Sequence, residues 1–308
     1  MTSPAAPSPG AEAPVATPAP PAGAAGAAPV PTSRPQPPGT LAVPPWRRYV
    51  ALGDSMTEGL WDVDPVGQSP RGWADLLAQR LAERRAAAGA GPVEYANLAV
   101  RGRLLGEIVE EQLPAALAHA PDLISLVGGG NDLLRPGADP DALAALLERA
   151  VRQVRAAGCD VLLATGMDTR ATPLRTTRSR VAVFNAHVWS VARRHGAHVV
   201  DVWGLRALQD WRMWAPDRIH LTTGGHERVT QAALVALGLG ADDPSWEDPL
   251  TPLPPVARAA RWRGDLGWVR QYAGPWAVRR LRGRSSGDAR QPKRPEPGAV
   301  ILVQEPRA

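Results

Sequence analysis

The chain has 308 residues, and its 33 prolines and 30 glycines are unevenly distributed, so we expect one globular domain with irregular ends rather than two domains. Cys159 is the single cysteine, which excludes an intrachain disulfide, and no run of about 20 strongly apolar residues is present that would span a bilayer. The net charge is +5, but residues 256–308 alone carry twelve basic and four acidic residues, so the remainder is slightly acidic and nucleic acid is not an expected partner.

Residues 1–43 consist almost wholly of alanine, proline, glycine, serine, threonine and valine. Glu12 and Arg34 are the only charged residues among the first 40. Such a segment cannot bury enough apolar surface to offset the entropy lost on ordering, so we expect a disordered arm. It also lacks the basic start and compact leucine-rich core of a secretory signal. Together with the absence of disulfides, this predicts a cytoplasmic protein.

Residues 44–242 alternate between short apolar runs and stretches with helical spacing. In the helix predicted from Asp141 to Ala157, apolar residues recur on one face, and Gly158 is expected to end it. This alternation predicts an α/β fold, a three-layer α/β/α sandwich around a five-stranded parallel sheet of flavodoxin-like type. The expected strands are 49–52, 93–100, 123–127, 161–164 and 198–203.

Residues 243–284 are expected to form a semi-rigid proline-rich spacer and a basic, tryptophan-containing amphipathic helix, which Pro275 should break or restart. Either the body of the protein or an anionic membrane surface could cover its apolar stripe, giving weak membrane-surface contact in the second case. We favour the body, because tryptophans exposed in the cytosol would promote aggregation. We expect residues 285–308 to be a disordered basic tail. The stripe consists of Trp262, Leu266, Val269, Ala273 and Trp276.

Polar and small residues follow four of the predicted strands. Ser55 comes after the first strand in the triplet Gly53-Asp54-Ser55, where it could equally cap the next helix. In a parallel sheet, the loops that follow the strands open on one edge, where ligands bind. The residues that these loops would bring together are Ser55, Gly102, Asn131, Asp217 and His220.

These five residues form a set that nucleophilic catalysis can use. A serine hydroxyl attacks well only when a base takes its proton, and the imidazole of His220 is suited to that work. Asp217, three residues earlier, would accept the other ring N–H and stabilise the imidazolium. The backbone N–H groups of Ser55 and Gly102 and the side-chain amide of Asn131 would supply an oxyanion hole.

The chain resembles the SGNH hydrolases, also called GDSL esterases and lipases, in four ordered blocks. These are Gly53-Asp54-Ser55, "NLAVRG" ending in Gly102, "GGND" containing Asn131, and "DRIH" from Asp217 to His220. The resemblance covers about residues 48–240. It implies an α/β/α sandwich, a Ser55-His220-Asp217 triad, oxyanion donors at Ser55, Gly102 and Asn131, and hydrolysis of a small-molecule ester or thioester without metal or cofactor.

Two functions remain open from the sequence, a serine esterase or lipase acting through an acyl-enzyme and a non-catalytic binding module that keeps the fold. The complete triad and oxyanion set favour the esterase. The remaining histidines show no metal-ligand spacing, and we expect surface or structural roles for them. Trp61, Trp73, Trp211 and Trp214 are near the motif loops and would either line a pocket or pack in the core. Arg101, Arg103 and Arg170 would either contact an anionic substrate or form a solvated face.

Overall fold

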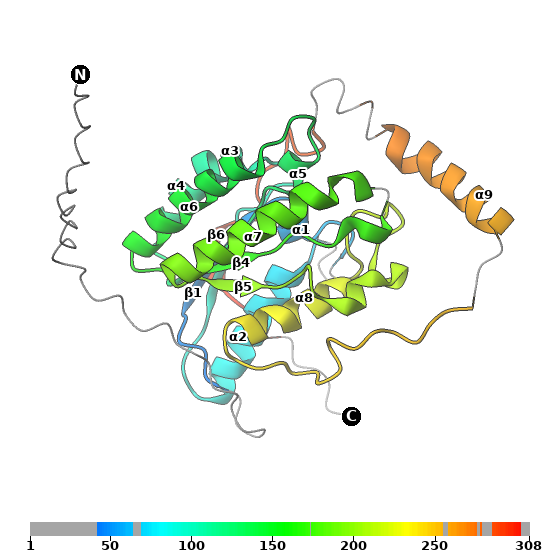
Figure 1. Ribbon diagram of the computed structural model, residues 1–308. Coiled ribbons are helices and arrows are strands. Elements are labelled where there is room, and N and C mark those ends of the chain that lie inside the picture. The colour runs from blue at the N-terminus through cyan, green and yellow to red at the C-terminus, as the bar shows by residue number, and fades with distance from the viewer. Residues whose placement is uncertain are drawn as a thin grey trace, which may run out of the picture. The chain divides into compact units, whose positions relative to one another are not determined.

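One six-stranded sheet organises the computed structural model, in the strand order β5-β4-β3-β1-β2-β6 (Figure 1). Strands β1 to β5 are parallel, and β6 runs antiparallel to β2. The strands are β1 (Arg48–Gly53), β2 (Glu94–Asn97), β3 (Leu123–Val127), β4 (Asp160–Ala164), β5 (His198–Val200) and β6 (Arg294–Ala299). The structure describes residues 42–63, 69–172, 174–254, 258–275, 278 and 285–302, so the expected N-terminal arm lies outside it apart from residues 42 and 43.

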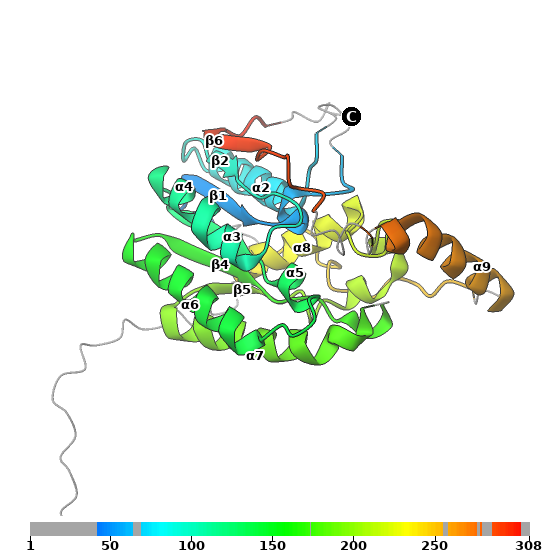
Figure 2. The same ribbon diagram turned by 90° about the horizontal axis from the view of Figure 1, so that it is seen from above.

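Helices pack on both faces of the sheet, which confirms the predicted three-layer α/β/α sandwich (Figure 2). On one face lie α2 (Trp73–Ala87) and α8 (Thr223–Ala236). The other face is covered by α6 (Pro140–Ala156), α7 (Arg178–His195) and the continuous helical run of α3 (Leu105–Glu107), the π-helical turn η1 (Ile108–Gln112) and α4 (Leu113–Ala118). None of the helices in the described part of the chain is long and apolar enough to cross a membrane.

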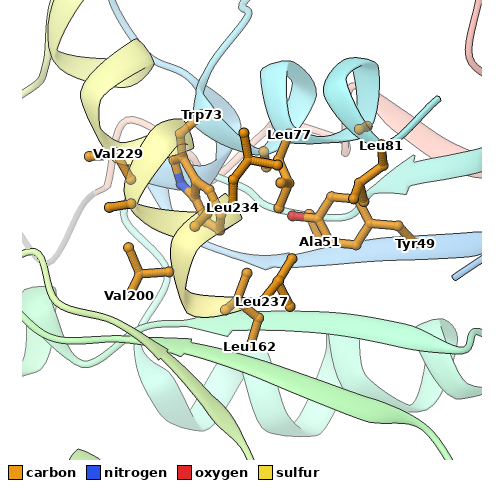
Figure 3. Packing of buried hydrophobic residues seen from close by; sticks show 14 of the residues in the cluster. Tyr49, Ala51, Trp73, Leu77, Leu81, Leu162, Val200, Val229, Leu234 and Leu237 are labelled. Atoms are coloured by element: carbon orange, nitrogen blue, oxygen red, sulfur yellow. The ribbon is translucent and has the colours of Figure 1, made fainter. Parts of the chain in front are cut away.

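Alternate residues of each strand enter one of two hydrophobic cores, because successive side chains in a strand point to opposite faces. Tyr49 and Ala51 of β1 pack with Trp73 and Leu77 of α2 and with Val229 of α8, as Figure 3 shows. Val50 and Leu52, their neighbours in β1, belong to the opposite core. All four β1 residues are fully buried, as expected for a central parallel strand.

The sixth strand corrects the prediction that residues 285–308 are a disordered tail. Residues 285–302 are described, and Arg294–Ala299 pairs with β2 at one edge of the sheet. Pro295 and Pro297 concealed this strand in the sequence, since proline is depleted in strands. An edge strand tolerates proline because the missing N–H can face away from its neighbour. The sheet is therefore mixed and six-stranded, whereas five parallel strands were predicted.

The seam between α2 and α8 contains His226, which is 1% exposed. Its Nδ1 accepts a hydrogen bond from the Trp73 N–H at 3.2 Å, and Thr230 Oγ1 donates to the Trp73 carbonyl at 3.1 Å. Burial lowers the pKa of His226 to about 4, so the ring is neutral at physiological pH. His226 thus joins two helices of the scaffold.

The helix predicted at 141–157 is α6, and Asp139 caps its start by accepting from the Asp141 and Ala142 N–H groups at 2.9 and 3.3 Å. Gly158 ends it in the left-handed region, with φ of +76°. The remaining short elements are α1 (Ser55–Glu58), α5 (Gly130–Leu133), η2 (Thr169–Ala171), η3 (Arg175–Thr177), η4 (Arg206–Gln209), η5 (Trp211–Met213), α9 (Arg258–Trp268) and η6 (Val269–Ala273).

Candidate active site

A cavity of about 1000 Å³ opens at the carboxyl ends of the strands. The neighbouring strands β1 and β3 lead into it, and the sheet order reverses at this point, which is where α/β sheets bind ligands. All the residues singled out in the sequence line this cavity. They are Ser55, Gly102, Asn131, Asp217 and His220.

Ser55, His220 and Asp217 form a continuous chain of hydrogen bonds. The Ser55 Oγ lies 2.9 Å from His220 Nε2, and His220 Nδ1 lies 2.6 Å from Asp217 Oδ2. Asp217 Oδ1 also accepts the backbone N–H groups of Ile219 and His220, both at 3.0 Å. These bonds hold the imidazole with Nδ1 toward the carboxylate and Nε2 toward the hydroxyl. Ser55 is the first residue of α1, and residues 217–220 form the loop before α8.

The Asp217 carboxylate stays ionised despite its position. Burial acts to raise its pKa, but the hydrogen bond and charge of His220, together with the two backbone N–H groups, outweigh this and lower it. The Arg218 backbone completes the turn in the left-handed region, with φ of +58°, which is strained for a residue with a side chain. The loop therefore presents acid and base together at the cost of a strained residue between them.

Asn131 lies at the start of α5, directly after β3. Its Nδ2 donates to Asp54 Oδ2 at 3.0 Å and to the Arg103 carbonyl at 3.1 Å. Asp54 in turn caps α1 by accepting the Met56 N–H at 3.1 Å. Asp54 thus joins the start of the helix that carries Ser55 to the side chain of Asn131. Two acceptors, Asp54 and the Arg103 carbonyl, hold the amide plane of Asn131.

Asp54 has an unusually basic carboxylate. Burial raises its pKa to about 6, and the nearby carboxylates of Asp132 and Glu58 add to this, while the Met56 N–H and His220 oppose it. The side chain that orients Asn131 therefore gains a proton in mildly acidic solution.

The Gly102 loop is packed against the C-terminal segment. Gly102 adopts φ of +79°, and a Cβ there would lie 1.9 Å from Ser285 Oγ. Gly287 approaches the Arg101 carbonyl so closely that a Cβ would lie 1.9 Å from its oxygen. A side chain at position 102 would be strained by the positive φ and would displace the Ser285 hydroxyl, and one at position 287 would have to move the Arg101 backbone. Residues 285–288 also line the cavity, a contribution that the sequence analysis did not anticipate.

A largely buried ion pair between Glu58 and Arg101 joins α1, the helix that begins at Ser55, to the Gly102 loop. Glu58 Oε2 accepts the Arg101 backbone N–H at 2.6 Å, and Arg101 Nε lies 2.9 Å from Glu58 Oε1. The two side chains are 8% and 11% exposed. Arg101 is thus paired and mostly shielded from solvent, which corrects the solvated-face interpretation for this residue, and it lines the cavity, while Arg103 pairs with Glu107 at 2.7 Å. Sequence analysis missed Glu58 because its partner is 43 residues away.

Gln112 also fixes the backbone next to Ser55, by bonding to the end of β1. Its side-chain amide accepts from the Gly53 N–H at 2.9 Å and donates to the Gly53 carbonyl at 3.0 Å. These two bonds satisfy the backbone N–H and carbonyl of Gly53, the last residue of β1, immediately before Asp54 and Ser55. Nothing in the local sequence pattern distinguishes Gln112 from a surface residue of its helix.

Three of the four tryptophans near the motif loops take one of the two roles considered for them, and Trp211 takes neither. Trp73 and Trp214 are buried in the core. Trp61 lines the cavity and is 44% exposed, and Trp211 lies beside Arg218, whose guanidinium carbon is 5.7 Å from its ring centroid. The apolar wall of the cavity comes mainly from other residues: Leu104, Leu133, Leu134, Val181 and Phe184.

The described residues contain neither a metal-binding cluster nor a reactive thiol. Among the described residues, no cluster of three or more histidine, cysteine or carboxylate side chains is arranged to hold a metal ion. Cys159 is 1% exposed, and burial raises the pKa of its thiol to about 12, so it remains protonated at neutral pH.

Comparison with known proteins identifies relatives over the region that contains this site. The sequence profile of the GDSL-like lipase/acylhydrolase family matches residues 51–228. No curated protein sequence matches the chain.

Three solved structures share the fold. LAE5, an α/β hydrolase enzyme from the metagenome of Lake Arreo, is 24% identical, with a TM-score of 0.53 over 65% of this chain and 99% of its own. Axe2, an acetylxylan esterase from Geobacillus stearothermophilus, is 19% identical, with a TM-score of 0.54 over 64% and 97%. A GDSL-like lipase homologue from Parabacteroides merdae is 17% identical, with a TM-score of 0.55 over 65% and 100%.

Proposed function

Because the chain belongs to the GDSL-like lipase/acylhydrolase family and is a carboxylic ester hydrolase, we propose that it cleaves its ester through an acyl-enzyme formed on Ser55. The observation that carries this proposal is the hydrogen-bonded chain from Ser55 Oγ through His220 to Asp217, with distances of 2.9 and 2.6 Å.

In acylation, His220 Nε2 takes the Ser55 hydroxyl proton as Oγ forms a bond to the ester carbonyl carbon. Asp217 accepts the Nδ1–H of the resulting imidazolium and stabilises its charge. The tetrahedral intermediate then collapses, the bond from carbon to the alkoxy oxygen breaks, and the alcohol leaves with the proton from Nε2. Water repeats the sequence on the acyl-Ser55 ester, releasing the acid and restoring the hydroxyl.

The oxyanion of each intermediate would be stabilised by the backbone N–H groups of Ser55 and Gly102 and by the amide of Asn131. An amide group has two hydrogens, and Asn131 Nδ2 already donates to Asp54 and to the Arg103 carbonyl. Donation to an oxyanion therefore requires Asn131 to share or exchange one of these contacts when substrate binds.

The apolar wall beside Ser55 supports binding of an acyl chain longer than acetyl. Val181 and Phe184 of α7 line the same cavity as Leu133 and Leu134, and aliphatic chains gain free energy in proportion to the apolar area that they bury. We propose esters of apolar acyl chains as the substrate class, with the alcohol group toward the open side.

A fluorophosphonate probe and a series of acyl nitrophenol esters test this proposal. Ser55→Ala should abolish labelling, and Ser55→Ala, His220→Ala and the double variant should each lose on the order of 10⁶ in kcat, because the residues act as a unit. Ser190→Ala is the matched control, since that hydroxyl donates to the Ala186 carbonyl on α7. Retention of more than about a hundredth of kcat in Ser55→Ala would contradict the assignment.

A further inference from the structure

Helix α9 and the turn η6 contact the catalytic body through one face. Trp268 Nε1 donates to the Asp217 carbonyl at 2.8 Å, and Asp265 pairs with Arg218 at 2.6 Å. Tyr272 packs edge-on against Trp61, with ring centroids 6.2 Å apart. Asp265, Trp268 and Tyr272 follow the spacing of one helical face. The helix therefore does contact the body, as the sequence analysis favoured.

Three members of the predicted apolar stripe, however, are exposed rather than docked, and Trp276 lies outside the described residues. Trp262 is 76% exposed, Leu266 is 64% exposed and Val269 is 49% exposed. The spacing of four and then three residues places them on one face of the helix, beside the face that contacts Arg218. The expectation that the body covers this stripe is wrong for these three residues, because the body bonds to Trp268 and Asp265 instead.

Basic residues flank the exposed stripe. Arg263 and Arg270 are exposed and seven residues apart, so they lie on the same side of the helix, away from Asp265. Tryptophan and leucine bordered by arginine are typical of helices that lie in the interface of an anionic membrane. A second copy of this chain would bring arginines of the same sign onto the same face, which favours a lipid partner over self-association.

The same helical unit borders the catalytic cavity. Gln271, Tyr272 and Pro275 line it together with Ser55 and His220. Trp268 bonds directly to the backbone of the triad carboxylate. Whatever binds the outward face of α9 is therefore brought next to the opening through which an ester would enter.

We propose that the exposed face of α9 and η6, formed by Trp262, Leu266 and Val269 with Arg263 and Arg270, binds an anionic lipid surface and presents the catalytic cavity to it. The helix lies outside the residues that match the family profile. The proposed lipid contact depends only on the exposed face and not on the proposed ester hydrolysis. Only the consequence that lipid-dissolved acyl esters are substrates rests on the proposed function.

Vesicle co-sedimentation of the full chain tests the contact without any catalytic readout. We compare phosphatidylcholine vesicles with vesicles that contain about one third phosphatidylglycerol, at roughly 0.05 M and 0.5 M salt. The protein should bind only the anionic vesicles, and more strongly at low salt. Trp262→Ser combined with Leu266→Ser should weaken binding about tenfold or more, since both side chains enter the interface.

Trp189→Ser is the matched control, because Trp189 is a 48% exposed tryptophan on α7 outside this face, and its vesicle binding should be unchanged. The proposal is overturned if the full chain does not bind anionic vesicles at low salt, or if the double variant binds as well as the wild type. It is also overturned if the double variant instead abolishes self-association in sedimentation velocity. Repeating the assay with Ser55→Ala separates it from the proposed chemistry, since a failure of hydrolysis leaves this binding unaffected.

Discussion

At the scale of single residues, the geometry of the site depends on side chains that bond to two different parts of the structure at once. Asp54 is an example, because one carboxylate oxygen caps the helix of Ser55 and the other holds the amide of Asn131. The geometry of the nucleophile and of the oxyanion candidate is therefore coupled through one buried acid.

Replacing Asn131 with alanine removes one donor to the developing oxyanion. We expect kcat to fall by roughly 10² to 10³ with little change in KM, because the oxyanion exists only in the transition state and the intermediate. Steady-state kinetics on a nitrophenol ester measures this. A change in KM alone would make Asn131 a ground-state binding residue instead.

The raised pKa of Asp54 predicts a pH dependence of stability. In the unfolded chain the carboxyl titrates near 3.8, whereas in the folded state it titrates at about 6, so the folded state binds the proton more tightly between these values. Relative to Asp54→Asn, the wild type should gain about 2 kcal/mol of unfolding free energy as the pH falls from about 7.5 to 4.5. Urea unfolding of both proteins at the two pH values measures this difference in unfolding free energy. The contributions of the other titratable groups cancel, because both proteins contain them. A pH-independent difference would show that the pKa of Asp54 is not raised.

At the scale of elements, the C-terminal segment is part of the catalytic body. Lys293, just before β6, donates to the Glu58 carbonyl at 2.6 Å, to the Pro70 carbonyl at 2.9 Å and to Asp75 Oδ2 at 2.6 Å. Its side chain is 13% exposed. One ammonium group thus joins the end of the nucleophile helix, the start of α2 and the last strand.

Lys293→Met should therefore destabilise the fold by about 3 kcal/mol, because it removes the ammonium partner of the Asp75 carboxylate, whose side chain is only 23% exposed. Burial already raises the pKa of Asp75, and Lys293 opposes that shift. Arg290→Met, at an exposed position of the same segment, should change stability by less than about 0.5 kcal/mol. Equal small effects of the two variants in urea unfolding would argue against a structural role for the ammonium group.

At the scale of the whole molecule, the hydrolase depends on residues beyond the family profile, which ends at residue 228. The segment 285–302 supplies a strand, a buried cation and part of the cavity wall. The helix α9 adds a contact to the loop that contains Asp217 and His220. The chain after α8 therefore contributes to the sheet, to the cavity wall and to the contacts of the Asp217 loop.

Ending the chain after Thr251 should lower the melting temperature by roughly 6 to 12 °C, since a loss of about 3 kcal/mol shifts a domain of this size by that amount. Circular dichroism on heating measures it. Removal of residues 1–40 serves as the comparison, because the sequence predicts that this arm is disordered and its loss should leave the melting temperature within about 2 °C. A truncated chain that melts like the full chain would show that the domain is complete without its C-terminal segment.

The sequence by itself determined the parallel core and the place of the site. The strands are buried on both faces and read as short apolar runs, and parallel strands end at one edge, so Ser55, Asn131 and His220 were expected together before any coordinates. The four motif blocks also identified the family. These inferences succeed because they depend on short-range periodicity and on residues within a few positions of each other.

Only the tertiary structure decided which distant residues became partners. Glu58 and Arg101 pair across 43 residues and Lys293 bonds to Asp75 across 218, and neither distance leaves a local pattern. The prolines of β6 conceal a strand that exists only because β2 offers it an edge. The apolar stripe of α9 was visible in the sequence, but its exposure follows from bonds that Trp268 and Asp265 make to Asp217 and Arg218. A helical pattern in the sequence indicates which residues share a face of the helix. Only the tertiary structure determines which of those faces packs against the rest of the protein.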